Sequence, residues 1–251
     1  MTELNPIVQL TDVSITFPGV KALDGVSFRL MPGEVHTLMG ENGAGKSTLI
    51  KALTGVYQID SGEIIVDGEA RRLTGAASAQ EAGISTVYQE VNLCGNLTIG
   101  ENVMLGHEER GWAGINWKKT NERAHDALSR MGLGNLDPRA PLSSLSIAMQ
   151  QLVAISRAMV TDSKVLILDE PTSSLDANEV EALFDVIRRL RDQGVAILFV
   201  SHFLDQVYAI SDRITVLRNG QFVGEYRTEE LDRAQLIGLM IGKDFESLRA
   251  L

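Results

Sequence analysis

The chain has 251 residues, 44% of them hydrophobic, and it carries a formal net charge of -10 with a pI near 4.9. That length allows one large domain or a core with an inserted lobe. The acidic balance favours solubility and argues against a nucleic acid partner, because phosphate backbones are bound by clustered basic residues.

Membrane and export signals are weak in this sequence. The longest apolar runs, such as residues 195–200, are much shorter than the roughly 18 residues that a membrane-spanning helix needs. Residues 1–10 contain no basic cluster and no long apolar stretch, so no secretory signal is predicted and we expect a cytoplasmic location. Cys94 is the only cysteine, which excludes an internal disulfide and a cysteine-rich metal site.

The predicted elements indicate an α/β fold. Residues 7–30 and 62–73 show strand and turn signals with no helix within either segment, which predicts a small antiparallel sheet. Farther along, short β-branched runs alternate with helical patterns, which predicts a mostly parallel sheet covered by helices. These runs lie at residues 34–39, 84–88, 165–168, 195–200 and 214–217.

Helical periodicity is clearest in three places. Residues 92–159 turn helical, which predicts an inserted helical subdomain. A helix is predicted to begin at Asp176 and to stop before Gly194, and the tail from Asp232 has helical spacing. We therefore expect one domain over residues 1–251. Its core is placed at 1–91 and 160–225, its helical subdomain at 92–159 and its helical tail at 226–251.

A glycine-rich turn follows the strand predicted at residues 34–39 and leads into a helix. The spacing G-x-x-x-x-G-K-S lets consecutive backbone NH groups surround the phosphates of a nucleotide, while the lysine reaches the β and γ phosphates and the serine can bind Mg²⁺. An accidental match is the competing interpretation. The predicted nucleotide-binding residues of this segment are Gly40, Asn42, Gly43, Ala44, Gly45, Lys46, Ser47 and Thr48.

Two acids follow the apolar strand predicted at residues 165–168. Asp169 and Glu170 are placed at the carboxyl edge of the sheet, where open α/β folds bind their ligands. Asp169 can hold the water shell of Mg²⁺, and Glu170 can orient and polarise an attacking water molecule. A buried strand that simply ends in a solvated acidic turn is the alternative.

Together these residues resemble the ATPase subunits of ABC transporters, and the resemblance extends from about Phe17 to Val223. It implies a P-loop ATPase fold that binds ATP and Mg²⁺. By the same resemblance, Phe17 stacks on adenine and Val20 is a further nucleotide-binding residue. Gln89 touches Mg²⁺ and takes part in catalysis, and His202 contacts the γ phosphate and the attacking water. Ser47 and Asp169 complete the implied metal ligands, and Asp176 belongs to a loop that crosses to a partner subunit.

Taken singly, three of these residues have ordinary alternatives. Gln89 is typical of a polar residue that ends a strand, and Phe17 of core packing in a turn. His202 is typical of a surface histidine.

The sequence departs from the family pattern L-S-G-G-Q, which is here Leu145-Ser146-Ile147-Ala148-Met149. Ser146 is still placed to cap a helix whose first NH groups, near Ala148, face the γ phosphate of a partner subunit. Because both glycines are replaced, the backbone approaches that phosphate less closely. We expect this chain to contribute weakly to the partner's site.

Within the family, the sequence resembles the first half of ATPases that import simple sugars, which carry two fused halves; 148–151 is most similar to the fructose or galactofuranose branch. The resemblance implies a head-to-tail dimer with a second half or a second copy, bound to a transmembrane permease at the inner face of the membrane. A sugar-binding protein would act indirectly, and residues 91–106 are the expected permease contact. The alternatives are a soluble ATPase of DNA maintenance or translation and a non-catalytic nucleotide-binding regulator.

Overall fold

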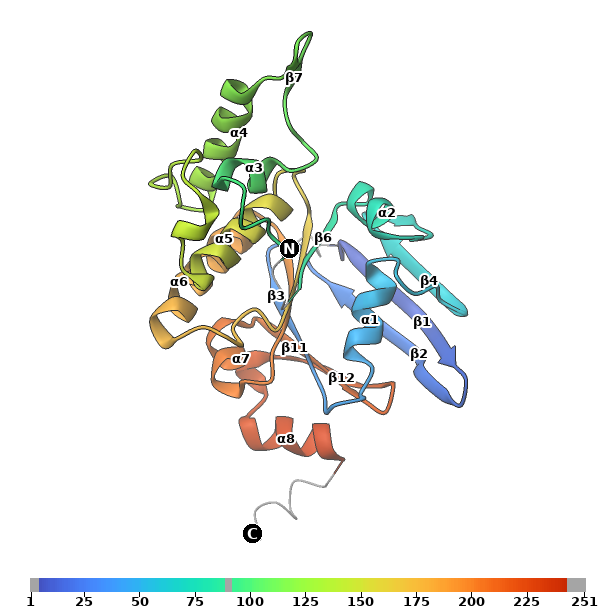
Figure 1. Cartoon of the computed structure of the whole chain (residues 1–251). Coiled ribbons are helices and arrows are strands. Elements are labelled where there is room, and N and C mark those ends of the chain that lie inside the picture. The colour runs from blue at the N-terminus through green and yellow to red at the C-terminus, as the bar shows by residue number, and fades with distance from the viewer. Residues whose placement is uncertain (1–4, 89–91, 243–251) are drawn as a thin grey trace.

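The computed structural model describes residues 5–88 and 92–242, and a six-stranded sheet lies at its centre (Figure 1). Its strands are β3 (Val35–Met39), β6 (Ile84–Val87), β9 (Val165–Asp169), β10 (Ala196–Val200), β11 (Arg213–Arg218) and β12 (Gln221–Arg227). The spatial order is β12-β11-β3-β10-β9-β6, and every neighbouring pair is parallel except β11 and β12. The predicted α/β fold with a mostly parallel sheet is confirmed, while the sequence analysis did not predict the antiparallel edge strand β12.

A second, antiparallel sheet lies beside the first. It consists of β1 (Val8–Phe17), β2 (Val20–Leu30), β4 (Ser61–Val66) and β5 (Glu69–Ala70). Their order is β2-β1-β4-β5, and each neighbouring pair is antiparallel. This confirms the small antiparallel sheet predicted from the strand and turn signals.

Alternation along the central strands builds two hydrophobic layers. Val165 and Ile167 of β9 belong to a core cluster that also contains the apolar residues of α1 (Lys46–Leu53) and of the antiparallel sheet. The intervening residues Leu166 and Leu168 belong to the opposite cluster, shared with α5 (Ile147–Ala158) and α6 (Ala177–Asp192). Because β9 is buried on both faces, its residues are apolar up to Asp169, where the strand ends.

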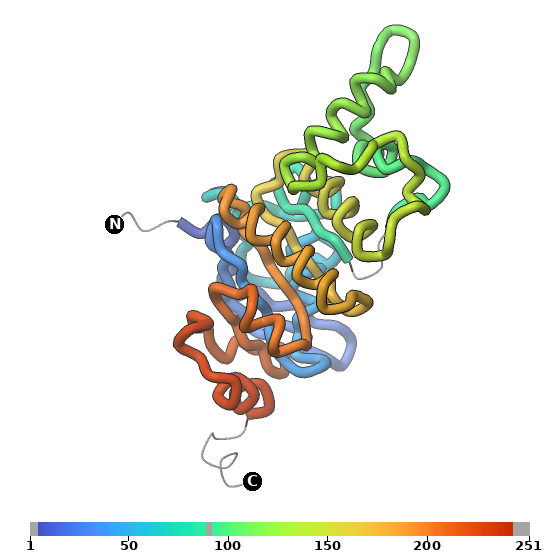
Figure 2. Tube along the Cα trace, turned by 90° about the vertical axis from the view of Figure 1, so that its left-hand side faces the viewer, coloured from blue at the N-terminus to red at the C-terminus, as the bar shows by residue number. Residues whose placement is uncertain are grey.

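The helical region forms an extension at one end of the molecule, which Figures 1 and 2 show from two sides. It contains α3 (Ile99–Met104), α4 (Trp117–Arg130), α5 and a hairpin of β7 (Arg110–Gly111) and β8 (Gly114–Ile115). Shorter elements complete the fold, namely α2 (Ala76–Glu81), α7 (Leu204–Ile210), α8 (Arg233–Ile241) and the 3-10 turns Leu142–Ser144 and Thr228–Glu230.

The predicted division of the chain into a core, a helical subdomain over 92–159 and a tail over 226–251 stays a prediction. Among the helices of residues 5–88 and 92–242, none is both long and apolar enough to span a bilayer.

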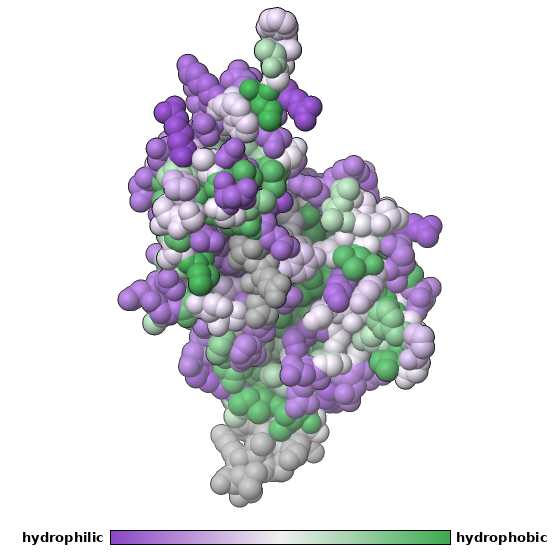
Figure 3. Space-filling view, viewed as in Figure 1, coloured by the Kyte–Doolittle hydropathy of each residue, from purple (hydrophilic) through white to green (hydrophobic). Residues whose placement is uncertain are grey.

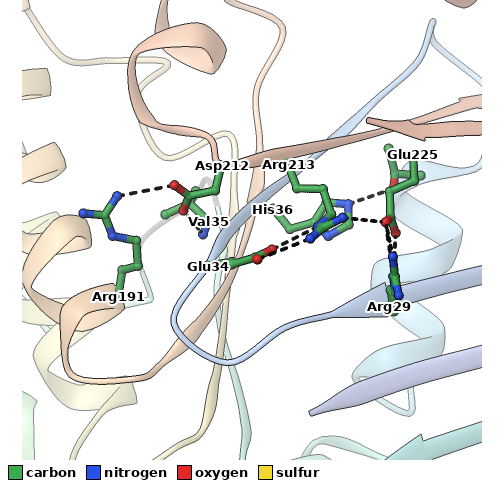
Figure 4. A network of polar contacts seen from close by, with 9 residues as sticks. Arg29, Glu34, Val35, His36, Arg191, Asp212, Arg213 and Glu225 are labelled. Carbon is green, nitrogen blue, oxygen red and sulfur yellow. Dashed lines mark hydrogen bonds and ion pairs between the residues drawn. The ribbon is translucent and has the colours of Figure 1, made fainter. Parts of the chain in front are cut away.

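A cluster of ion pairs joins the two sheets near the start of β3 (Figure 4). Arg213 of β11 donates to Glu34, at 3.0 Å, and to Glu225 of β12, at 2.8 Å. Glu225 also accepts from Arg29 of β2, at 2.8 Å. Burial alone would raise the pKa of Glu225, but the hydrogen bond and charge of Arg29, together with the charge of Arg213, hold it below the ordinary value of 4.5.

Replacing Arg213 with methionine is expected to lower the free energy of unfolding by about 3 kcal/mol at pH 7, because it leaves two partly buried carboxylates without their shared cation. Since the pKa of Glu225 is depressed in the folded protein, this stabilisation is present above pH 4.5 and is lost as the pH falls through the lower folded value. Urea unfolding across that range checks both effects.

A matched control is Arg188→Met, which removes a half-buried arginine paired with the exposed acids Glu181 and Asp185 on α6. Its cost should stay below about 1 kcal/mol. Equal losses of unfolding free energy in the two variants would show that the ion pairs of Arg213 between the sheets stabilise the fold no more than a surface ion pair does.

Candidate active site

The loop between β3 and α1 depends on glycine for close packing. A Cβ atom on Gly40 would lie 2.4 Å from the carbonyl oxygen of Leu217 and 2.7 Å from Cβ of Ala44. Gly45 caps α1 at a φ of +104°, and a Cβ there would lie 2.8 Å from the carbonyl oxygen of Ala22. The glycines at the two ends of the motif are therefore required by contacts with the rest of the fold.

Lys46 folds back over this loop. Its Nζ donates to the carbonyl oxygens of Gly40, at 2.6 Å, and Glu41, at 3.0 Å. Burial lowers the pKa of Lys46, whereas the negative charges of Glu170 and Asp169 act in the opposite direction. The ammonium group is thus held at the loop mouth, close to the acids that end β9.

Asp169 and Glu170 lie at the carboxyl end of β9, as predicted. Burial raises the pKa of Asp169, and the neighbouring charge of Glu170 adds to this effect, while Lys46 and Lys51 oppose it. Glu170 has a left-handed backbone with a φ of +49°, and its NH donates to the carbonyl oxygen of Val200 at 2.9 Å. A glutamate in this conformation is strained, and such strain is concentrated at functional sites.

His202 contacts Glu170 directly. It follows β10, which lies between β3 and β9 in the sheet, so three loops meet at one edge. The distance between Nδ1 of His202 and Oε2 of Glu170 is 2.9 Å. The imidazole is mostly exposed and the carboxylate is mostly buried, which leaves the ring free to contact a ligand above the edge.

Phe17 lies at the end of β1 and packs edge-on against Tyr57, with ring centroids 5.0 Å apart. Nζ of Lys51, on α1, lies 5.0 Å from the centroid of Tyr57. This chain of contacts connects the predicted adenine-binding aromatic to the helix that begins at Lys46. Val20, also predicted to bind nucleotide, is exposed at the start of β2.

The residues predicted to act on a partner's nucleotide lie at the starts of two other helices, α5 and α6. Ser146 caps α5, its hydroxyl accepting from the NH of Met149 at 3.3 Å, and Asp176 caps α6. Ile147 is 63% exposed, but Ala148 is only 7% exposed. Of the two residues that replace glycine, Ile147 therefore projects its side chain from the helix start, whereas the methyl group of Ala148 packs inward.

The structure brings Lys46, Asp169, Glu170 and His202 to one sheet edge, together with the start of α1 that carries Ser47 and Thr48. Gln89 lies outside the described residues. Tyr57 was missed by the sequence analysis, because its contact with Phe17 joins segments far apart in the chain and no motif marks it.

A glycine loop, an acidic strand end and a histidine at the edge of a largely parallel sheet define a P-loop ATPase, and comparison with known families names the class more closely. The family described as "ABC transporter" matches residues 23–173. The chain belongs to this family, as one of its ATPase domains.

Several curated proteins are similar over nearly the whole chain. The Fructose import ATP-binding protein FruK of Bifidobacterium longum is 66% identical over 248 residues, which cover 99% of this chain and 48% of that protein. The Galactofuranose transporter ATP-binding protein YtfR of Escherichia coli O157:H7 is 53% identical over 241 residues, with 96% and 48% coverage. The chain therefore spans about half the length of these relatives. The similarity to sugar importer ATPases expected from the sequence is confirmed.

Solved structures agree with the fold. The ADP conformation of MJ1267, an ATP-binding cassette of an ABC transporter, has a TM-score of 0.82 and 27% identity, covering 98% of this chain and 99% of that one. A dimeric post-hydrolysis state of the cassette MJ0796, bound to ADP and Pi, has a TM-score of 0.72 and 25% identity, with coverage of 88% and 98%.

Proposed function

We propose that this chain binds and hydrolyses ATP to drive sugar import, as one half of a longer ATP-binding protein or as one copy in a dimer. The observation that carries the proposal is the contact between Glu170 and His202 beside Lys46. Glu170 would polarise the attacking water, and His202 would hydrogen-bond the γ phosphate. Lys46 and the loop amides would hold the phosphates.

Mg²⁺ fits this arrangement. Asp169 is a partly buried carboxylate whose charged form is disfavoured by burial and by Glu170, so a cation at this place would relieve both effects. Mg²⁺ is typically held by one or two protein oxygens together with substrate phosphates, and here Ser47 and Asp169 would supply them. Gln89 is the further ligand that the resemblance implies. The ion would neutralise charge on the phosphates.

A second ATPase unit would complete each site. We propose that Ser146, the NH of Ala148 and Asp176 face the nucleotide of a partner half, because α5 offers the positive end of a helix whose first turn is exposed at Ile147. Support comes from the similarity to a cassette whose structure is dimeric.

The permease contact has a suitable surface. A groove of about 540 Å³ lies between the central sheet and the helical region, and its described lining includes Asn92, Leu93, Leu105, Gly106 and His107. This surface overlaps the segment expected to dock the permease, of which residues 92–106 are described. We propose that a transmembrane permease binds here and holds the chain at the inner face of the membrane, with a sugar-binding protein acting through the permease. The printed names of the relatives support fructose or a furanose sugar as the class of cargo.

The altered helix start at Ile147 predicts that the isolated chain, paired only with itself, binds ATP well but hydrolyses it slowly. Replacing Ile147 with glycine should raise the turnover rate by about tenfold or more, because the projecting side chain is removed and backbone NH groups regain close approach to the transferred phosphate. Steady-state ATPase assays at micromolar chain concentration check this.

The same Ile147→Gly replacement in a Lys46→Ala background serves as the control, and it should leave turnover near zero. Rapid turnover by the unaltered isolated chain would contradict the weakened contribution. In the assembled transporter, ATPase activity that rises when sugar is added would support the import function. An ATPase that is fully active but does not respond to sugar would contradict that function.

A further inference from the structure

The segment 110–119 differs in composition from the rest of the chain. Its ten residues contain both tryptophans of the protein, Trp112 and Trp117, and three basic residues, Arg110, Lys118 and Lys119. It contains no aspartate or glutamate, although the whole chain has a net charge of -10. An aromatic and basic segment in an acidic protein indicates a specific contact rather than a solvated loop.

Residues 110–115 of this segment form a hairpin that projects from the helical region, and residues 117–119 are the first residues of α4. Arg110 pairs with Ile115 and Gly111 with Gly114, so Trp112 and Ala113 form the tip. Trp112 is fully exposed, at 102% of its reference area, while Trp117 and Ile115 are 47% and 40% exposed. In Figures 1 and 2 the hairpin is the farthest point of the helical region, and in the space-filling view it stands clear of the body (Figure 3).

Two acids, Glu108 and Glu109, precede the hairpin. The carboxylate of Glu108 accepts from the NH of Gly106 at 3.0 Å, and this bond, with a smaller effect of the charge of Arg110, lowers its pKa. Glu109 accepts from Arg123 at 2.5 Å and lies 3.3 Å from Nζ of Lys119. The ion pairs found among the described residues do not include Arg110 or Lys118. Arg110 in β7 and Lys118 in α4 therefore supply positive charge without a direct ion pair on the two sides of the exposed indole ring of Trp112.

A lipid surface fits this shape better than a protein pocket. Energetically important side chains in protein interfaces are surrounded by a ring of other contacts that excludes water, and a lone projecting tip has no such surround. Tryptophan with lysine or arginine is the combination typical of the membrane–water interface, where the ring enters the headgroup layer and the cations attract anionic lipid. Lipid needs no complementary cavity.

The geometry points to the hairpin as a membrane contact: we propose that Trp112 inserts into the headgroup region of an anionic phospholipid bilayer while Arg110 and Lys118 bind lipid phosphates. The hairpin follows closely in the chain after Leu105, Gly106 and His107, which line the groove described above. The identity of the membrane as that of the permease rests on the proposed function. The contact itself does not, because it requires neither ATP nor a permease.

The two tryptophans make the test direct. In the full chain carrying Trp117→Phe, Trp112 is the only source of tryptophan fluorescence. With vesicles of phosphatidylglycerol and phosphatidylcholine at millimolar lipid, we expect a blue shift, and we expect quenching by lipids brominated high on the acyl chain. Raising the salt concentration or omitting phosphatidylglycerol should weaken both signals.

Variants separate the parts of the contact. Lys118→Ala should lower the vesicle partition coefficient by about fivefold, because a basic residue near an anionic surface contributes about 1 kcal/mol. Lys164→Ala, which removes an exposed lysine that pairs with Asp67 far from the hairpin, should leave partitioning unchanged. An unshifted Trp112 spectrum and undiminished iodide quenching at millimolar lipid would overturn the proposal, as would crosslinking of the tip to a permease without any lipid quenching. The vesicle assays require neither ATP nor a permease, so failure of the membrane contact is distinguishable from failure of the proposed function.

Discussion

Replacing Glu170 with glutamine is expected to lower the rate of ATP hydrolysis by at least about a hundredfold while ATP still binds, because the carboxylate that polarises the water is lost and general base catalysis contributes at least that much. The change keeps the shape of the side chain, so the contact with Nδ1 of His202 can persist as a neutral hydrogen bond. Single-turnover hydrolysis and equilibrium ATP binding, measured on the same preparation, check both parts.

Glu181→Gln provides a matched control on the exposed face of α6, where the carboxylate pairs only weakly with Arg188 at 3.6 Å. Its hydrolysis rate should equal that of the unaltered chain. Because the isolated chain is expected to turn over slowly, the comparison is best made in the assembled transporter. Unchanged turnover in the Glu170→Gln transporter would remove this residue from the role we propose.

Replacing Lys46 with alanine is expected to weaken ATP binding by about ten- to a hundredfold, because a hydrogen bond to a charged phosphate contributes about 1.5–3 kcal/mol. In the structure this ammonium group bonds to the carbonyl oxygens of Gly40 and Glu41, so it is already held at the mouth of the loop. Titration calorimetry with ATP and Mg²⁺ measures the loss.

Lys164→Ala removes the same charge at the opposite end of β9 and should leave the ATP affinity as it is. Two variants with equal affinities would show that Lys46 does not touch the phosphates. Thermal unfolding of both variants without nucleotide would separate a binding defect from a folding defect.

The sequence was most informative where local pattern and chemistry coincide. The run Val165–Asp169 predicts both a buried strand and the position of its acids, because a strand covered on both faces must be apolar until it leaves the sheet. The glycine spacing before Lys46 likewise predicts the strand, turn and helix that the structure contains. The helix starts at Ser146 and Asp176 are confirmed by their capping hydrogen bonds.

Features that depend on distant contacts were not predictable in this way. The edge strand β12 and the cluster around Arg213 require knowing that Glu34 and Glu225 meet across two sheets. The left-handed backbone of Glu170 has no sequence signal, since glutamate rarely adopts it and only the surrounding fold imposes it. The different directions of Ile147 and Ala148 also follow only from how α5 packs.

The most direct measurement is a crystal structure of the Glu170→Gln chain grown with ATP and Mg²⁺. We predict a triphosphate enclosed by residues 40–47, with Nζ of Lys46 moved from the carbonyl oxygen of Gly40 to the phosphates and the metal near Ser47 and Asp169. Nucleotide bound elsewhere at saturating concentration, with this loop empty, would contradict the role of residues 40–47 in binding phosphate.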